Sequence, residues 1–245
     1  MAKEVILRFG GRIVRTEPEW LACLFGRRSD VFFIQIGAHD GISDDSIFPF
    51  ARGRGWRGIL VEPVRYLFDR LTENYAGAAG VILENKALAE QDGVVTFYSV
   101  KQTSDEVPEW YDQIGSLKRD VILSHQASIP NIADYLAEIQ VEAISFDTLV
   151  AKHNVTHVDL ILIDTEGYDL NILRTINLDR FRPTLIIFEQ KHLTSEGKAE
   201  AVRMLASHGY VVHGFGPNAA ATRTAYWRFG YWWPRGRGSG SGEAA

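Results

Sequence analysis

The sequence predicts an α/β fold with an open, mostly parallel sheet that has helices on both faces. The first observation is a set of short apolar runs, rich in β-branched and aromatic residues, at 31–36, 58–61, 158–163 and 184–188. Such runs are typical of strands buried on both faces of a parallel sheet. The second observation is helical spacing of apolar residues after a strand, as in 64–75. Strands that alternate with helices favour an open parallel sheet.

The first half of the chain adds a lead-in and two further strands. Residues 1–30 form a lead-in of mixed pattern, with one short amphipathic helix at 20–25. A third strand is expected at 81–83. A fourth is expected at 94–100, near or outside the main parallel set. The acids and the serine at 44–46 are expected to cap the first helix that follows the first strand.

The second half of the chain predicts helices at 168–175 and 195–208 and ends in an antiparallel strand pair. Ser195 is a suitable N-cap for the second helix, and Gly209 is a suitable stop. The two final strands are expected at 210–215 and 222–229, joined through Gly216, Pro217 and Asn218.

Two segments interrupt or follow this pattern. Residues 101–143 contain Pro108 and Pro130 and many polar residues, with helical spacing at 117–125 and 131–140. An insert of this length in an α/β domain is typical of a lid or a substrate-binding surface. Residues 234–245 read as a flexible tail, which leaves 31–233 as the domain.

Composition excludes several classes of protein. The chain has 245 residues, 46% of them hydrophobic and 23% charged, which argues against overall disorder. Its net charge of −5 makes a general nucleic-acid binder a poor candidate. The single cysteine, Cys23, excludes an intrachain disulfide scaffold. No apolar run approaches the length of a membrane span, and the N-terminus does not read as a signal peptide, so a cytoplasmic location is expected.

The residues that follow the strands predict a cofactor site, because ligands of such sheets bind outside the carboxyl ends of the strands. A turn with two glycines, Gly37-Ala38-His39-Asp40-Gly41, follows the first strand. Glu62 follows the second strand, where a carboxylate can accept hydrogen bonds from ribose hydroxyls. Together they indicate a cofactor that contains adenosine. The middle position holds His39 rather than the glycine of a dinucleotide fingerprint, which argues against NAD.

A set of motifs in fixed order resembles the FkbM family of methyltransferases. The motifs are FIQIGAHDG, GWRGILVEP, ENKALAEQDGVVTFY, ISFDTL, VDLILIDTEGYDLNIL and LIIFEQKH. The resemblance implies a Rossmann-like class I methyltransferase fold with a seven-stranded sheet and a C-terminal antiparallel pair. It also implies S-adenosylmethionine as cofactor and methyl transfer to a hydroxyl of a sugar, polyketide or similar metabolite. The chain departs from the wider class at Gln35, where an acid is common, and at His39.

The resemblance and the strand ends together give the expected site residues. Asn85 is expected either to contact the adenine edge or to cap a turn. The expected cofactor-binding residues are Gly37, Ala38, His39, Asp40, Gly41, Ser46, Glu62, Pro63, Asn85, Ala87 and Asp164.

The expected catalytic residues follow the fourth and fifth strands of the parallel set. Transfer to a neutral alcohol needs a proton acceptor, for which His192, Asp164 and Glu166 are the candidates. Glu166 has the alternative role of capping the next helix. Asp164, Glu166 and Glu189 are also a candidate oxygen-ligand set for a divalent cation. A homodimer is compatible with the sequence, and the competing functions are an NAD-dependent oxidoreductase and a non-catalytic binding protein.

Overall fold

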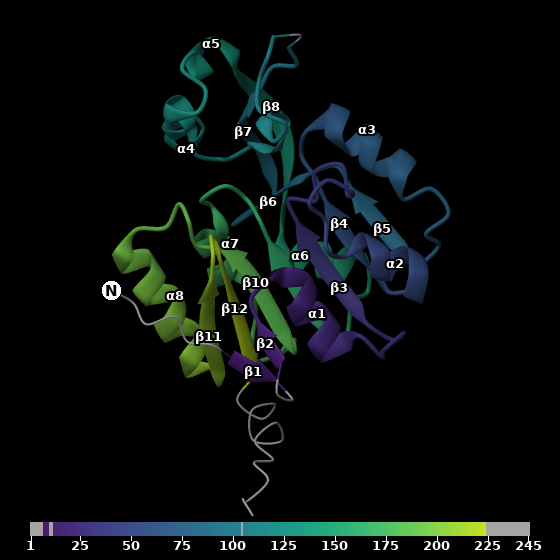
Figure 1. Cartoon of the computed structure of the whole chain (residues 1–245). Helices are drawn as coiled ribbons and strands as arrows, with labels where there is room; N and C mark the ends of the chain where they lie inside the picture. Colours follow the sequence, from purple (N-terminus) through teal and green to yellow (C-terminus); the bar gives the residue numbers. More distant parts are fainter. Residues whose placement is uncertain (1–6, 10–11, 104, 224–245) are drawn as a thin grey trace, which may run out of the picture.

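A seven-stranded sheet forms the centre of the protein in a computed structural model that describes residues 7–9, 12–103 and 105–223 (Figure 1). The strand order is β11-β12-β10-β9-β3-β4-β5. All neighbours are parallel except β12, which runs antiparallel to both β10 and β11. This confirms the predicted class I architecture. The strands are β3 (Phe32–Ile36), β4 (Arg57–Val61), β5 (Val81–Glu84), β9 (Leu160–Ile163), β10 (Leu185–Glu189), β11 (Tyr210–Phe215) and β12 (Asn218–Arg223).

Helices cover both faces of this sheet. Successive side chains of a strand point to opposite faces, so Phe33 joins one buried cluster and Ile34 joins the other. The first cluster packs against α1 (Glu17–Phe25), α2 (Phe48–Arg54) and α3 (Arg65–Asn74). The second packs against α6 (Phe146–Lys152), α7 (Asp169–Thr175) and α8 (Ser195–Ser207).

The predicted lead-in contributes directly to the core. Trp20, Leu21 and Phe25 of α1 are fully buried in the same cluster as Phe33 of β3. Ahead of α1, β1 (Leu7–Phe9) and β2 (Arg12–Val14) form a separate antiparallel pair. None of the helices within the described residues is both long enough and apolar enough to cross a membrane.

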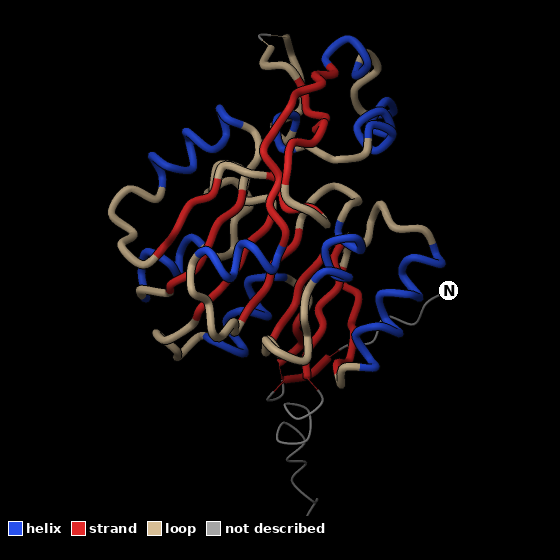
Figure 2. Tube along the Cα trace, turned by 180° about the vertical axis from the view of Figure 1, so that it is seen from behind, coloured by secondary structure: helices blue, strands red, loops and turns tan. Residues whose placement is uncertain are grey.

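The predicted insert at 101–143 is part of a longer segment, 87–145, which contains a second, three-stranded sheet over the carboxyl ends of the main strands (Figure 1). This whole segment forms the insert of the fold. Its strand order is β6-β8-β7, with β7 outside the main sheet as predicted. Figure 2 shows these strands rising from the main sheet toward the short helices of the insert. The elements are β6 (Ala87–Ala89), β7 (Gly93–Val100), η1 (Tyr111–Gln113), α4 (Arg119–Ser124), η2 (His125–Ala127), α5 (Ile132–Tyr135) and β8 (Leu136–Ser145).

Four boundary predictions were wrong. The helix expected at 131–140 ends at Tyr135, because Leu136–Ser145 pairs antiparallel with β7 over its whole length. The last strand begins at Asn218 instead of 222, directly after a tight turn from β11. Thr194, not Ser195, is the N-cap of α8, since its hydroxyl accepts from the Gly197 amide at 3.1 Å.

The fourth concerns α2, which begins at Phe48 rather than at Asp44. The Asp45 carboxylate still accepts from the amides of Ile47 and Phe48, at 2.6 and 2.9 Å, so it supports the start of that helix. The tail predicted at 234–245 and the strand residues expected at 224–229 lie outside the described residues.

Candidate functional site

A cleft lies where the carboxyl ends of β3, β4 and β9 meet the insert. Its walls are formed by residues 35–39, 61–64, 86–88, 112–115 and 162–166. It encloses about 1210 Å³, including the part that is open to solvent. The cleft therefore occupies the edge of the sheet at which this architecture binds ligands.

The turn after β3 requires glycine at its first position. Gly37 has a φ of +82°, and a Cβ atom there would lie 1.8 Å from the carbonyl oxygen of Asp164. The amides of Gly37 and Ala38 both donate to the carbonyl of Val61, at 3.0 and 3.1 Å. The backbone of this turn is thus held between β4 and β9, with its outer side facing the cleft.

Glu62 ties this turn to the end of β4. Its Oε2 accepts from the His39 amide at 2.9 Å, and its Oε1 accepts from the Val64 amide at 2.8 Å. The side chain is only 4% exposed, and burial raises the pKa of Glu62 to about 8 against the effect of these two hydrogen bonds. Each carboxylate oxygen retains a second acceptor position, and Glu62 lines the cleft, so it can receive two ligand hydroxyls.

The predicted cofactor residues divide into those that line the cleft and those that shape its loops. Asp40 accepts from the amides of Ile42 and Ser43, and the Asn85 amide group donates to the carbonyls of Glu62 and Pro63. Asp40, Gly41, Ser46 and Asn85 are not part of the cleft wall. The predicted residues in the wall are Gly37, Ala38, His39, Glu62, Pro63, Ala87 and Asp164.

Sequence reasoning missed an acidic group at the inner end of the cleft. Gln35 donates to Asp45 at 3.1 Å, and Glu17 from the start of α1 reaches the same wall. Burial, together with nearby carboxylates, raises the pKa of Glu17 to about 7 and that of Asp45 to about 6. Two carboxylates thus line the cleft together with Gln35, the position at which an acid is common in the wider class. The only sign of this acidic group in the sequence was Gln35 itself, because the wider class often has an acid at that position.

The wall of the cleft is strongly acidic. Among the residues that the structure describes, this wall contains seven carboxylates and a single lysine, Lys86, which forms an ion pair with Glu142. This charge suits a cationic ligand and disfavours the pyrophosphate of NAD. The carboxylates are Glu17, Asp44, Asp45, Glu62, Asp112, Asp164 and Glu166.

The turn after β9 is held in place by a buried acid. Asp169 accepts from the Gly167 amide and the Thr165 hydroxyl at 3.2 Å, and from the Glu189 amide at 3.1 Å. Burial raises the pKa of Asp169 to about 8. Asp169 therefore fixes Glu166, whose φ is +48°, against the end of β10. Its signal was the third acid after the strand in the motif VDLILIDTEGYDLNIL, where it follows Asp164 and Glu166.

Asp164 follows β9, Glu189 ends β10, and His192 comes shortly after β10. These three side chains are the remaining groups of the site that can take part in chemistry. Asp164 is open to the cleft, and desolvation by the surrounding protein followed by the charge of Glu166 raises the pKa of Asp164 to about 6. His192 Nε2 lies 2.8 Å from Glu166 Oε2 and 3.9 Å from Glu189 Oε2. Carboxylate oxygens of Asp164, Glu166 and Glu189 lie within 4.8 Å of one another. The predicted catalytic and cation-binding residues are thus brought together.

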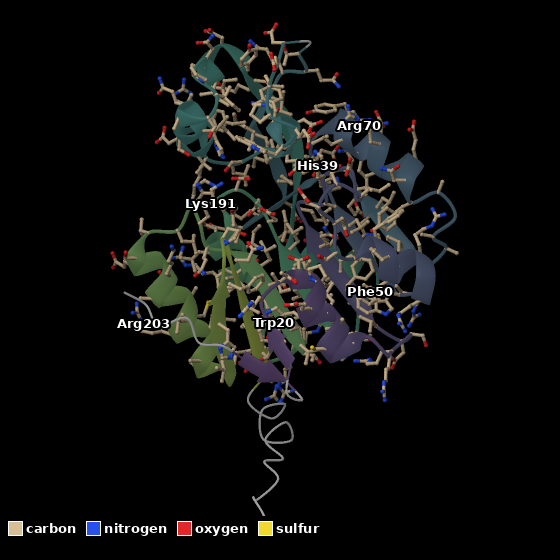
Figure 3. All side chains as sticks on the ribbon, viewed as in Figure 1. Trp20, His39, Phe50, Arg70, Lys191 and Arg203 are labelled. Atoms are coloured by element: carbon tan, nitrogen blue, oxygen red, sulfur yellow. The ribbon has the colours of Figure 1, made fainter. Side chains whose placement is uncertain are left out.

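A second pocket adjoins the cleft beneath the insert. It shares Gln113, Ile114 and Glu166 with the cleft. Figure 3 shows His39 and Lys191 beneath the insert, and Trp20 and Phe50 farther away in the body of the domain. The remaining residues of this pocket are Trp110, Ser124, His125, Ser128, Lys191 and His192.

The insert is fastened to the core at the turn after β9. The Ser116 hydroxyl donates to the Glu166 carbonyl at 2.7 Å, and the Lys118 ammonium donates to the Gly167 carbonyl at 2.6 Å. A Cβ atom on Gly167 would lie 3.0 Å from Cβ of His192 and 3.1 Å from the Val121 side chain. The insert and the β10 end therefore approach this one turn from two sides.

One solved structure supports the fold, and a second is similar at a lower level. A methyltransferase FkbM from Methylobacillus flagellatus KT is 13% identical, with a TM-score of 0.50 over 79% of this chain and 44% of that one. This chain thus spans less than half the length of that protein. A precorrin-6y C5,15-methyltransferase from Geobacter metallireducens GS-15 is also 13% identical, with a TM-score of 0.40 over 79% of this chain and 82% of that one. No curated protein matches the chain.

The family model described as the methyltransferase FkbM domain matches residues 35–212, which is more than half of the chain. The match begins at Gln35 in β3 and ends at Val212 in β11, so it includes the insert and most of the cleft wall, but not Glu17. S-adenosylmethionine is the cofactor that this family implies. The chain belongs to the FkbM family of methyltransferases.

Proposed function

We propose that this methyltransferase transfers the methyl group to a hydroxyl oxygen of a small molecule or glycan. The observation that carries the proposal is the position of Glu166, which forms part of the wall of both the cleft and the second pocket. A cofactor in the cleft and an acceptor in the pocket would meet at this residue. Holding two reactants side by side in this way is a major source of catalysis.

The cleft fits S-adenosylmethionine by shape and charge. Glu62 would accept the two ribose hydroxyls, and Leu88 and Phe97 offer apolar surface for the base. Glu17 and Asp45 would bind the ammonium group, next to Gln35, whose Oε1 is buried and has no hydrogen-bond partner among the described residues. When bound, the cofactor supplies a methyl group on a positively charged sulfur, which suits the acidic wall.

Asp164 is the carboxylate that we assign to proton uptake. An alcohol must lose its proton as the new C–O bond forms, and a group with a pKa near neutral is suited to accept it. Asp164 opens into the cleft, and the pKa of its carboxyl group is about 6. Glu166 and His192 lie beside it as a close pair that would orient the acceptor.

The second pocket favours a hydroxylated acceptor. The Trp110 ring offers a flat apolar face, as sugar rings and aromatic metabolites require. Ser128 and Lys191 offer hydrogen-bond donors around it, and Ser124, whose hydroxyl donates to the Val121 carbonyl, offers an acceptor. This combination of one aromatic surface and several polar groups is typical of sites that orient a small ligand.

The test begins with cofactor binding by the purified protein. Calorimetry should detect S-adenosylmethionine binding, and Glu62→Gln should weaken it roughly 10- to 100-fold, because hydrogen bonds to a charged group are lost. Glu73→Gln, on the exposed surface of α3, is the matched control and should leave binding unchanged. Well-folded protein that binds no S-adenosylmethionine would contradict the proposal.

Turnover is then measured as release of the demethylated cofactor with a library of hydroxylated acceptors. Asp164→Asn should lower turnover roughly 100-fold or more, since general bases contribute about 10²–10⁴-fold. Binding of S-adenosylmethionine should change far less in this variant. Cofactor binding without turnover for any hydroxylated acceptor would favour a binding protein, and turnover only with amines or thiols would overturn the assignment to oxygen.

A further inference from the structure

A cluster of two histidines and one glutamate lies in the wall of the second pocket. His125 comes from η2 of the insert, whereas Glu166 and His192 follow β9 and β10 of the core. One ring nitrogen of each histidine and one carboxylate oxygen of Glu166 all lie within 4.8 Å of one another. The cluster therefore forms only when the insert is docked on the core.

The atoms of this cluster lack the partners that buried polar groups normally have. His192 Nε2 and Glu166 Oε2 are 2.8 Å apart, yet both are buried and neither has a hydrogen-bond partner of acceptable geometry among the described residues. Glu189 Oε2, 3.9 Å from His192 Nε2, is likewise buried and without a partner there, on a side chain that is 7% exposed. Buried polar atoms that converge on one point without hydrogen-bond partners are a suitable place for a bound ion.

A backbone carbonyl fixes one ring nitrogen of His125 and leaves the other available. The histidine Nδ1 lies 3.0 Å from the Val121 carbonyl, which can only accept, so Nδ1 carries the hydrogen and Nε2 keeps its lone pair. The ring is 9% exposed and lies against Trp110 and His192, with both pairs of ring centroids 5.6 Å apart. A backbone carbonyl that fixes the tautomer of a histidine in this way is typical of metal sites.

We propose that His125, Glu166 and His192 bind a divalent transition-metal ion such as Zn²⁺. Two imidazoles and a carboxylate suit zinc and its neighbours, whereas Mg²⁺ prefers oxygen ligands alone. Glu189 is close enough to join the set, and the neighbouring carboxylate of Asp164 belongs to the oxygen-only alternative.

The ion would also have a role in binding the acceptor. All three ligands line the second pocket, so a coordination position would open toward the molecule bound there. An oxygen atom of the acceptor would occupy that position and be held beside Glu166. This role rests on the proposed function, whereas binding of the metal itself does not depend on it.

The test uses the full chain, freed of metal with a chelator and titrated with Co²⁺. The wild type should show visible ligand-field absorption that Zn²⁺ displaces, and Mg²⁺ should not compete. His125→Gln and His192→Gln should each weaken Co²⁺ binding by roughly 100-fold, since one of three ligands is lost. The control is His157→Gln, which changes a histidine that is 64% exposed and should leave the spectrum unaltered.

Two measurements on the same samples separate the possible failures. Circular dichroism verifies that each variant is folded, and calorimetry with S-adenosylmethionine verifies the cofactor site. A protein that binds S-adenosylmethionine and turns over but binds no Co²⁺ overturns the metal site alone. Co²⁺ binding with no methyl transfer overturns the proposed function alone. Mg²⁺ binding that both histidine variants retain would assign the ion to Asp164, Glu166 and Glu189 and overturn the proposal.

Discussion

The two sides of the site are built in different ways. The cofactor side, formed by 35–45 and 61–64, consists of loops that directly follow β3 and β4 and bond to each other, as in the contact of His39 with Glu62. The acceptor side, formed by 110–128 and the ends of β9 and β10, depends on contacts between the insert and the core, such as Ser116 with Glu166. The fold itself determines the first side, whereas docking of a separate segment determines the second.

The two sides also differ in the core that supports them. The cofactor side rests on the strands of the main sheet, whose buried clusters extend over both faces. The insert has its own small cluster, which consists of Val100, Tyr111, Ile114, Ile122, Ile129 and Ile132. A segment with few buried apolar contacts opens at a lower free-energy cost than the body of a domain. We therefore expect the acceptor side to open while the cofactor side stays formed.

The largest effect should come from Gly37→Ala, which places a new atom at the closest backbone contact of the cofactor side. The new Cβ would lie 1.8 Å from the Asp164 carbonyl, and the residue must also keep a φ of +82°. Gly77→Ala is a matched control, because its φ is +87° but nothing lies within 4 Å of the new atom. The control should cost about 1–2 kcal/mol from the backbone conformation alone.

Gly37→Ala should lower the free energy of unfolding by roughly 3 kcal/mol more than the control, since a clash in a packed interior is added. Urea unfolding measures both variants, and calorimetry should find no S-adenosylmethionine binding by Gly37→Ala. Equal stability of the two variants would contradict the close approach of position 37 to the Asp164 carbonyl.

The cofactor side was the part that the sequence could predict. Gly37 and Glu62 directly follow strands, and the carboxyl ends of parallel strands meet at one edge, so order along the chain implies proximity in space. Glu17 was not predicted, because α1 precedes the first core strand and only the packing of α1 on the sheet brings this acid to the cleft. Asn85 follows a strand as expected, yet it bonds to backbone carbonyls rather than facing the cleft.

On the acceptor side, Glu166 and His192 follow strands and were predicted, whereas the residues that the insert contributes could not be predicted, because they do not follow strands of the main sheet. His125 is 67 residues before His192, and nothing in its spacing indicates that the two rings lie 5.6 Å apart. The strand Leu136–Ser145 was mistaken in part for a helix, since its partner β7 lies some 40 residues away in the chain. Long-range pairing overrides local propensity in such segments.

A smaller effect is expected from Ser116→Ala, which loosens the acceptor side alone. The buried hydroxyl of Ser116 donates to the Glu166 carbonyl and accepts from the Lys118 amide at 2.9 Å, so both groups lose a partner. The cost of about 1–2 kcal/mol should appear as roughly tenfold faster proteolysis within the insert. S-adenosylmethionine affinity should stay within twofold of the wild type.

Thr103→Ala is the control for this variant, because within the described part of the chain the Thr103 hydroxyl bonds only to the Asp105 amide, which also belongs to the insert. It should leave proteolysis of the insert unchanged. If Ser116→Ala weakened S-adenosylmethionine binding as much as Glu62→Gln does, the two sides would not be separable.

An effect no larger than that of Ser116→Ala, and visible only as a change with pH, concerns the stability contributed by Glu17 in the protein without cofactor. The pKa of Glu17 is about 7 in the folded state against 4.5 for an unperturbed glutamate, so the folded state holds the extra proton between these values. The free energy of unfolding therefore falls as pH rises from about 4.5 to 7. Glu17→Gln removes this fall in unfolding free energy, because the glutamine side chain does not titrate.

Relative to the wild type, Glu17→Gln should gain roughly 1–2 kcal/mol in unfolding free energy between pH 5 and pH 8, allowing for partial exposure of the side chain. Urea unfolding at the two pH values measures the difference, with Glu73→Gln as the control for loss of a surface charge. At pH 8 the same variant should bind S-adenosylmethionine several-fold more weakly, because an ammonium partner is lost. A variant that is more stable but binds the cofactor more weakly is expected only if Glu17 contacts the ligand. A variant in which neither property changes would show that Glu17 is not part of the cofactor site.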